Sequence, residues 1–410
     1  MGKVLGIVCE YNPFHNGHLY HLEELKKITG SNYSIAIMSG NFTQRGSTAI
    51  IDKWSRTETA LKAGIDLVIE LPTLYAISSA ENFADGAIHI LDSLKIVDYV
   101  GFGAETSDID VLDNIADVLY NEPRAYKTLL SHELNKGISF PKARENALLI
   151  YLNNIRKYVN VVSAPNNILG IEYIKALKKY KSIIKPISIA RFEAGHNDLS
   201  YHSNIASGTT IRNIIKNGNF DILRRLVPES TYSILMDNIK QTHIVPDLSV
   251  FERQIFYNLR KMSIEEIRNL PDVTEGLEFS IKKAANSCNS IYEFLNIIKS
   301  KRYTSTRLQR ILLYSLLEIT KKDMELSRKV TPYIRVLGLN NKGKFMISEI
   351  AKANPKLEII TSVKRFLDSS NNKNLKTMLN KDIFATDVYT LGFTYDSCSN
   401  LDFTKKIITL

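Results

Sequence analysis

The chain has 410 residues, of which 44% are hydrophobic and 23% are charged. That composition excludes a disordered or collagen-like chain, and three cysteines are too few for a disulfide-stapled scaffold. Lys and Arg together number 53 against 43 Asp and Glu, which leaves a net charge of +10. The length predicts two domains, or one large domain with an appendage.

Targeting and cysteine patterns predict a cytoplasmic protein. One charge and a short apolar run precede Glu10, which is not the pattern of a signal peptide. No apolar stretch reaches the roughly 18 residues that indicate a membrane span. Cys9, Cys288 and Cys398 show no metal-ligand spacing, which favours a reducing compartment and disfavours a structural zinc site.

The first 220 residues alternate short apolar runs with amphipathic stretches such as Leu19–Ile28 and Lys53–Ala63. The runs that predict buried strands are Val4–Cys9, Tyr33–Met38, Leu67–Leu71, Tyr99–Phe102 and Ile183–Ala190. This alternation predicts an α/β domain at 1–220 with a Rossmann-like parallel sheet. Ligands of such sheets bind at the carboxyl ends of the strands, so the loops that follow the strands are expected to share one pocket.

From about residue 220 the pattern predicts a mostly α-helical region, 221–410. Apolar residues recur at spacings of three and four in Ile222–Leu226, Ile255–Met262 and Leu308–Ile319. Two strand-like segments, Val388–Tyr395 and Lys406–Leu410, end the chain. They are expected either to form a small sheet of their own or to return to the first domain.

The positive charge is concentrated in the helical region. Residues 1–220 carry 23 basic and 22 acidic side chains, whereas residues 281–380 carry 20 basic and only 7 acidic ones. Such an excess attracts polyanions, of which nucleic acid is the commonest; the alternative is a solvated surface without a partner. The acid-free window 300–310 supplies the candidates for RNA phosphate contact, which are Lys301, Arg302, Arg307 and Arg310.

The loop after the first strand, Glu10–Leu19, is the most informative segment. It leads into a helix, whose N-terminus attracts anions through unpaired N–H groups and a partial positive charge. His15 and His18 flank Gly17, which allows a phosphate to approach closely, and imidazoles stabilise charge that grows on a phosphate. The alternative is that both histidines only cap or pack the helix.

The tetrapeptide His15-Asn16-Gly17-His18 resembles the HxGH signature of the HIGH-motif nucleotidyltransferase superfamily. Members of that superfamily bind ATP or CTP, direct attack on the α-phosphate and release pyrophosphate. Ser207–Arg212 partly matches their second signature, an ISSTxIR-like segment, and departs from it at Ala206 and Gly208. Its hydroxyls and guanidinium suit the oxygens of the β- and γ-phosphates.

Longer segments resemble the tRNA(Met) cytidine acetate ligase family. They are Glu10–Leu19, Met38–Gly46, Asp66–Pro72, Phe102–Glu105 and Pro165–Gly170. The resemblance implies that acetate and ATP form acetyl-adenylate and pyrophosphate, after which the acetyl group moves to N4 of the wobble cytidine of elongator tRNA(Met). It also implies that acetyl-CoA is not used. The sequence indicates no oligomeric state.

The same resemblance implies the residues of the ATP site. His15, His18 and Arg212 are the expected catalytic residues. The expected nucleotide contacts are Val8, Cys9, Glu10, Tyr11, Asn12, Pro13, Phe14, His15, Asn16, Gly17, His18, Leu19, Tyr20, His21, Gly103, Asn166 or Asn167, Arg191, Thr209 and Thr210. On local grounds Gly103 is equally a turn glycine, and one asparagine of the pair is equally a helix cap.

The loop after the second strand is expected to border the same pocket. Gln44 and Arg45 are candidates for binding acetate or cytidine, because a carboxylate needs donors and arginine offers a fork of them. Lys53 is a candidate for the α-phosphate, or else an exposed helix lysine. Glu70 and Glu81 lack a neighbouring acidic partner, so Mg²⁺ is expected to bind through ATP phosphates and water rather than at a protein site.

Three alternatives remain open at this point. One is a nucleotidyltransferase that acts on a small phosphorylated acceptor, and another is an RNA-binding protein that holds nucleotide without catalysis. A third is an aminoacyl-tRNA synthetase, suggested by Lys261-Met262-Ser263. The synthetase is disfavoured because the lysine after this segment is absent, and because Ser263 and Glu266 fit an ordinary capping box.

Overall fold

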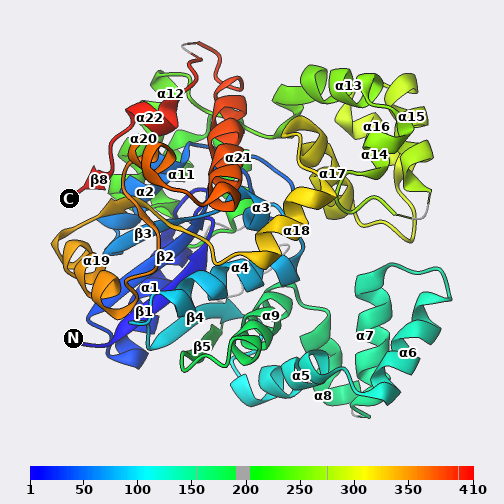
Figure 1. Ribbon diagram of the computed structural model, residues 1–410, viewed down its shortest axis with the longest axis horizontal. Helices are drawn as coiled ribbons and strands as arrows, with labels where there is room; N and C mark the ends of the chain where they lie inside the picture. The colour runs from blue at the N-terminus through cyan, green and yellow to red at the C-terminus, as the bar shows by residue number, and fades with distance from the viewer. Residues whose placement is uncertain (154, 191–203, 275, 396) are drawn as a thin grey trace.

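One mixed β-sheet organises the computed structural model, which describes residues 1–153, 155–190, 204–274, 276–395 and 397–410 (Figure 1). The strands are β1 (Val4–Cys9), β2 (Tyr33–Ser39), β3 (Leu67–Leu71), β4 (Tyr99–Ala104), β5 (Lys185–Ala190), β6 (Ile334–Leu339), β7 (Ile359–Ile360) and β8 (Ile408–Thr409). Strands β1 to β5 are mutually parallel in the order β5-β4-β1-β2-β3, which confirms the predicted Rossmann-like sheet. Strand β6 then joins β3 in the antiparallel sense, and β7 and β8 both pair with β6.

Helices separate and cover these strands. Between β1 and β5 lie α1 (Asn16–Thr29), α2 (Lys53–Lys62), α3 (Thr73–Ala76), α4 (Ala80–Ser93), α5 (Ile109–Asn121), α6 (Arg124–Leu134), α7 (Phe140–Tyr151), α8 (Ile155–Val162) and α9 (Pro165–Lys179). Between β5 and β6 lie α10 (Gly208–Lys216), α11 (Phe220–Leu226), α12 (Glu229–Lys240), the 3-10 helix η1 (Leu248–Phe251), α13 (Glu252–Lys261), α14 (Ile264–Arg268), α15 (Leu277–Ser287), α16 (Ile291–Ile298), α17 (Ser305–Leu316) and α18 (Lys321–Lys329). The remaining helices are α19 (Asn341–Ala353), α20 (Val363–Ser369), α21 (Lys373–Thr390) and α22 (Leu401–Thr404). None of these described helices is long and apolar enough to cross a membrane.

The central strands are buried on both faces, as their continuous apolar runs predict. Helices α1 and α2 cover one face, where Leu25 and Ala60 belong to the same buried cluster as Leu5 and Val68 of the strands. Helices α4, α9 and α19 cover the other face within the larger core cluster. Strand β1 lies at the point where the strand order reverses, so its carboxyl end opens onto the crevice in which such sheets bind ligands.

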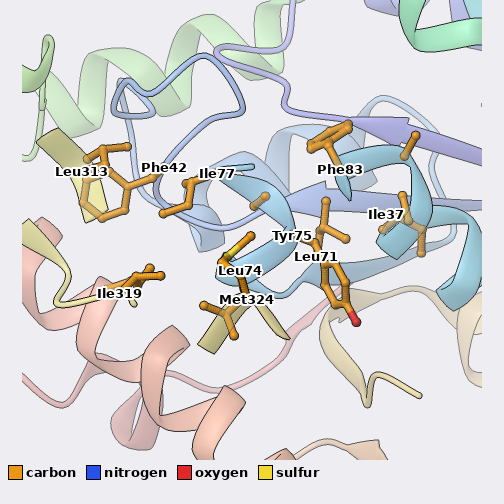
Figure 2. Close-up of a cluster of buried hydrophobic side chains, with 14 of the residues drawn as sticks. Ile37, Phe42, Leu71, Leu74, Tyr75, Ile77, Phe83, Leu313, Ile319 and Met324 are labelled. Carbon is orange, nitrogen blue, oxygen red and sulfur yellow. The ribbon is translucent and has the colours of Figure 1, made fainter. Parts of the chain in front are cut away.

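The helical lobe α13–α18 packs directly against this sheet domain. Figure 2 shows Leu313, Ile319 and Met324 of that lobe facing the α3 region around Leu74 and Ile77. The hydroxyl of Tyr314 also donates to the backbone carbonyl of Ile77 at 2.8 Å. The basic region and the sheet therefore share one continuous hydrophobic core.

The chain after residue 220 contributes strands that the sequence did not predict. All six residues of β6 are buried, and β7 extends the sheet beyond it. The segment Lys406–Leu410 does contain a strand, β8, which returns to the first domain. The division into two functional domains at residue 220 stays a prediction. The sheet itself crosses that boundary, because β6, β7 and β8 come from the second half of the chain.

The predicted strand Val388–Tyr395 is wrong. Residues Val388 to Thr390 are the last residues of α21. Tyr389 packs edge-on against Phe42 and Phe393, and its hydroxyl donates to the carbonyl of Ala49 at 2.8 Å. Packing of one helix face outweighs the β-propensity of Val, Tyr and Thr here.

Four buried charges join the end of the chain to the sheet. Lys53 Nζ lies 2.8 Å from Glu70 Oε1 and 2.8 Å from Asp402 Oδ1, and its side chain is fully buried. Arg335 pairs with the same two carboxylates. The prediction that Lys53 lies against the α-phosphate is therefore wrong, because two carboxylates already neutralise its enclosed ammonium. The alternative of an exposed helix lysine is wrong for the same reason.

Removing one member of this cluster should destabilise the protein strongly. Asp402→Ala leaves Lys53 and Arg335 with one carboxylate between them, and an uncompensated buried charge costs about 3–5 kcal/mol of unfolding free energy. Urea denaturation measures the change. Lys62→Ala is the control, because its exposed pair with Glu58 contributes less than about 1 kcal/mol. Equal effects of the two substitutions would contradict the role given to the cluster.

Candidate nucleotide-binding site

The HxGH loop sits at the carboxyl end of β1 and opens α1. His15 is the N-cap, and its backbone N–H donates to Nδ1 of His18 at 3.3 Å. The two rings stack with centroids 3.7 Å apart. A neutral His18 that accepts at Nδ1 carries its proton on Nε2, so it presents a donor suited to a phosphate oxygen. A Cβ at Gly17 would lie 3.0 Å from the His15 ring, which explains the glycine.

Aromatic packing holds this histidine pair in place. Tyr11 and Phe14 are buried, and their rings lie 5.0 and 5.6 Å from the His18 ring, measured between centroids. Val8 and Cys9 end β1, residues 10–15 form the loop, and residues 16–21 form the first turns of α1. The Asn16 side chain donates to the carbonyls of Asn204 and Arg225, beside α10 and α11.

Asn12 ties this loop to its two neighbours. Its Nδ2 donates to the carbonyl of Thr48 at 3.1 Å, and its Oδ1 accepts from the N–H of Ile50 at 2.8 Å. Its own carbonyl accepts from Nη1 of Arg212 at 2.8 Å. One residue therefore fixes the positions of the loops after β1 and β2 and of helix α10.

The second signature lies beside the first, although about 190 residues separate them in sequence. Ser207 caps α10, and Arg212 Nη2 donates to the hydroxyl of Thr209 at 3.0 Å. A Cβ at Gly208 would lie 3.3 Å from Arg212 Nη1 and 3.9 Å from His15 Nε2. The structure thus brings together His15, Arg212 and the exposed Thr209, while Thr210 occupies the same first turn.

The loop after β2 completes this side of the pocket. The Gln44 backbone N–H donates to Glu10 Oε1 at 2.7 Å, and its side chain donates to the carbonyl of Ser78 at 3.0 Å. The second of these bonds engages the Gln44 side-chain amide with the protein rather than with acetate. Arg45 is exposed and makes no hydrogen bond or ion pair with another described residue, so its guanidinium is available to an anion.

Arg56 is a residue that the sequence analysis missed. It is 0% exposed and donates to the carbonyls of Ile51, Glu10, Ser39 and Gly40. Burial lowers the pKa of its guanidinium, although nearby acidic groups oppose this shift. Its spacing in the helix could have revealed that Arg56 is buried. Arg56 lies one turn before Ala60, and both side chains lie on the inward face of α2.

The end of β4 supplies the remaining candidates. Gly103 is half-buried in β4. Asn167 is 1% exposed and hydrogen-bonds to Thr106 and Val161, so its side chain serves the fold. Asn166 lies nearer the surface and donates to Glu105. It is the better candidate of the pair for ligand contact. Arg191 lies outside the described residues.

Comparison with known proteins identifies the lineage of this chain. Residues 2–402 match the family described as HIGH Nucleotidyl Transferase. The tRNA(Met) cytidine acetate ligase of Thermoanaerobacter sp. (strain X514) is 45% identical over 99% of this chain and 100% of its own length. That of Caldanaerobacter subterraneus subsp. tengcongensis is 46% identical over the whole of both chains. The chain belongs to the tRNA(Met) cytidine acetate ligase family.

A crystal structure of a family member has the same fold. Thermotoga maritima TmcAL bound with alpha-thio ATP superposes with a TM-score of 0.92 at 36% identity. The alignment covers 100% of this chain and 99% of that chain. The match extends through the helical lobe as well as the sheet, so this lobe belongs to the family's fold.

The RNA-contact candidates from the acid-free window 300–310 divide into two pairs. Lys301 and Arg302 are exposed, and Arg302 approaches Gly137 of the α6–α7 turn. Arg307 donates to the carbonyl of Asp272 and lies over the ring of Tyr303. Arg310 is 8% exposed and bonds to the Asp272 carboxylate at 3.0 Å. The prediction that Arg310 contacts RNA is wrong, because its guanidinium is buried in that ion pair.

Glu70 and Glu81, the two carboxylates considered for magnesium, are both paired with basic side chains. Within the described residues, no group of three or more His, Cys, Asp or Glu side chains is placed to hold a metal ion. Glu70 is engaged by Lys53 and Arg335, and Glu81 pairs with Lys175 at 2.6 Å.

Arg56 should be essential for the shape of the pocket. Arg56→Met leaves the carbonyls at the ends of β1 and β2 without their buried donor, so the unfolding free energy should fall by about 3 kcal/mol. Arg56→Lys keeps the charge but not the fork of donors, and it should restore only part of the loss. Thermal unfolding with and without ATP measures both effects. Wild-type stability of Arg56→Met would refute this role.

Proposed function

We propose that this chain is an ATP-dependent tRNA(Met) cytidine acetate ligase. It forms acetyl-adenylate from acetate and ATP and transfers the acetyl group to N4 of the wobble cytidine of elongator tRNA(Met). The observation that carries the proposal is full-length identity of 45–46% to ligases of that name. The contact between Arg212 and Asn12, which joins both nucleotidyltransferase signatures, supports it. We place the reaction in the cytoplasm, where tRNA is found.

In the first step an acetate oxygen attacks the α-phosphorus, and the bond from that phosphorus to the bridging oxygen breaks. Negative charge grows on the α-phosphate oxygens in the transition state. His15 and His18 lie at a helix N-terminus, where ring N–H donors and the helix dipole stabilise such charge. Arg45, exposed beside this loop, binds the acetate carboxylate.

The leaving pyrophosphate is bound by the start of α10. Arg212 is oriented by Asn12 and Thr209, and the hydroxyls of Thr209 and Thr210 lie in the same turn. The Arg212 guanidinium provides several donors to phosphate oxygens. Mg²⁺ accompanies the ATP phosphates and is held by them and by water.

In the second step cytidine N4 attacks the carbonyl carbon of the acetyl-adenylate and AMP leaves. Both steps use binding, orientation and electrostatic stabilisation, and neither requires a covalent enzyme intermediate. The tRNA is held by the basic helical lobe, with Lys301 and Arg302 as phosphate contacts. Because that lobe shares the core of the sheet domain, it holds the acceptor at a defined position relative to the nucleotide.

His18 should be required for adenylate formation but not for tRNA binding. His18→Ala removes one donor to the α-phosphate, so acetate-dependent ATP–pyrophosphate exchange should fall at least about 100-fold. The dissociation constant for tRNA should change less than about twofold. His132→Ala is the control, because His132 is exposed on α6. Exchange that is absent from the wild-type protein with every carboxylate would disprove the ligase activity itself.

Reversal of the two exposed basic residues should weaken tRNA binding selectively. Lys301→Glu with Arg302→Glu replaces phosphate attraction by repulsion, so affinity should fall about tenfold or more and its salt dependence should decrease. Exchange of pyrophosphate should persist. Lys352→Glu with Lys356→Glu changes the net charge equally in the last turn of α19 and just after that helix, which lies on the opposite side of the view in Figure 1. Equal losses in both double variants would indicate only a general charge effect.

A further inference from the structure

Glu10 is a carboxylate among basic side chains, since the guanidinium groups of Arg45, Arg56 and Arg212 lie close enough to act on it electrostatically. It is the first residue after β1, and it is partly buried. Oε1 accepts the Gln44 N–H at 2.7 Å, whereas Oε2 accepts no hydrogen bond from any described residue. Phosphate binding does not explain this residue, because a carboxylate repels phosphate and acetate alike. Its position calls for a chemical reason.

The surroundings place Glu10 between the nucleotide loop and the helical lobe. Through Gln44 it contacts the loop after β2. Two residues further on, Gly46 lies so close to α17 that a Cβ there would be 2.6 Å from the Arg310 backbone nitrogen. A tRNA held by the lobe and a nucleotide held by the HxGH loop therefore approach each other at Glu10.

The second step needs a proton acceptor. The lone pair of cytidine N4 is delocalised into the ring, so the amine is a weak nucleophile. Once N4 bonds to carbon it becomes strongly acidic, and a carboxylate is then a sufficient base. The histidines and arginines around the pocket are donors in the first step and do not supply an acceptor.

We propose that Oε2 of Glu10 is the general base of acetyl transfer, an inference that rests on the proposed function. The N4 lone pair forms a bond to the acetyl carbonyl carbon, and one N4 proton moves to Oε2. The bond from that carbon to the phosphate oxygen breaks, and its electron pair leaves with AMP. The products are N4-acetylcytidine, AMP and a neutral Glu10 carboxylic acid, which then returns its proton to water.

Charged groups from several elements surround this carboxylate and set its pKa. Burial raises the pKa of Glu10, while the Gln44 N–H and the guanidinium groups of Arg45, Arg56 and Arg212 oppose the rise. Buried Tyr173 of α9 faces the same group. A raised pKa brings the base closer to neutral pH, where proton transfer is most effective. The transfer rate should therefore rise with pH through the pKa of Glu10 and then level off.

The test separates the two chemical steps by supplying synthetic acetyl-adenylate with tRNA to the full-length protein. Glu10→Gln keeps an oxygen for the Gln44 N–H but cannot accept the proton, so single-turnover transfer should fall about 100-fold or more. The fold-loss in pyrophosphate exchange should be at least ten times smaller than the fold-loss in transfer. The rise of the transfer rate with pH should disappear. Glu10→Asp should recover part of the transfer rate with a pH-dependent limb.

Other outcomes overturn the proposal. If transfer and exchange fall equally in Glu10→Gln, or if the transfer rate of that variant still rises with pH, Glu10 has a structural role only. Glu58→Gln, at a half-buried position on α2, is the matched control and should leave transfer and exchange at wild-type rates. A third outcome is that Glu10→Gln folds normally while the wild-type protein itself transfers no acetyl group from acetyl-adenylate. The proposed function then fails, and this inference fails with it.

Discussion

The wholly buried guanidinium of Arg56 holds the ligand-binding edge of the sheet together. Parallel strands leave unpaired carbonyls where they end, and here Arg56 donates to those of Glu10, Ser39 and Gly40 in one place. Only arginine carries enough donors in a fixed fork for this task. The loops after β1 and β2 both begin at the carbonyls that it binds, so the positions of the HxGH histidines depend on a residue one layer below them.

A second set of buried charges connects the end of the chain to the same sheet. Lys53 and Arg335 oppose Glu70 and Asp402, and the four charges cancel. Burial raises the pKa of Asp402, but Lys53 and Arg335 outweigh it and hold that pKa below its ordinary range. The backbone N–H of Lys53 donates to Oδ1 of Asn41, and Asp52 caps the helix that begins at Lys53, so this residue is also tied to the loop after β2. The last residues of the chain therefore help to position the nucleotide site, although they lie far from it in sequence.

Sequence patterns predicted the parallel strands and the phosphate-handling loop because both depend on local order. A short apolar run that leads into His15-Asn16-Gly17-His18 has few other structural solutions. The same approach failed at Val388–Tyr395, where β-branched and aromatic residues pack along one face of α21 instead. It also missed β6, whose pairing partner β3 precedes it by more than 260 residues. Pairing of that kind leaves little local signal.

The sequence by itself determined the fold class, the HxGH motif that opens a helix after the first strand, and the concentration of positive charge after residue 280. Only the tertiary structure decided which charged side chains remain accessible to ligands. Arg45, Lys301 and Arg302 are exposed. Lys53 is paired with two buried carboxylates from distant segments, whereas Arg310 is paired with the half-buried carboxylate of Asp272. The physical reason is that a charge can be buried only where opposite charges or hydrogen-bond acceptors compensate it, and the packing of the whole molecule decides which of these groups lie beside it.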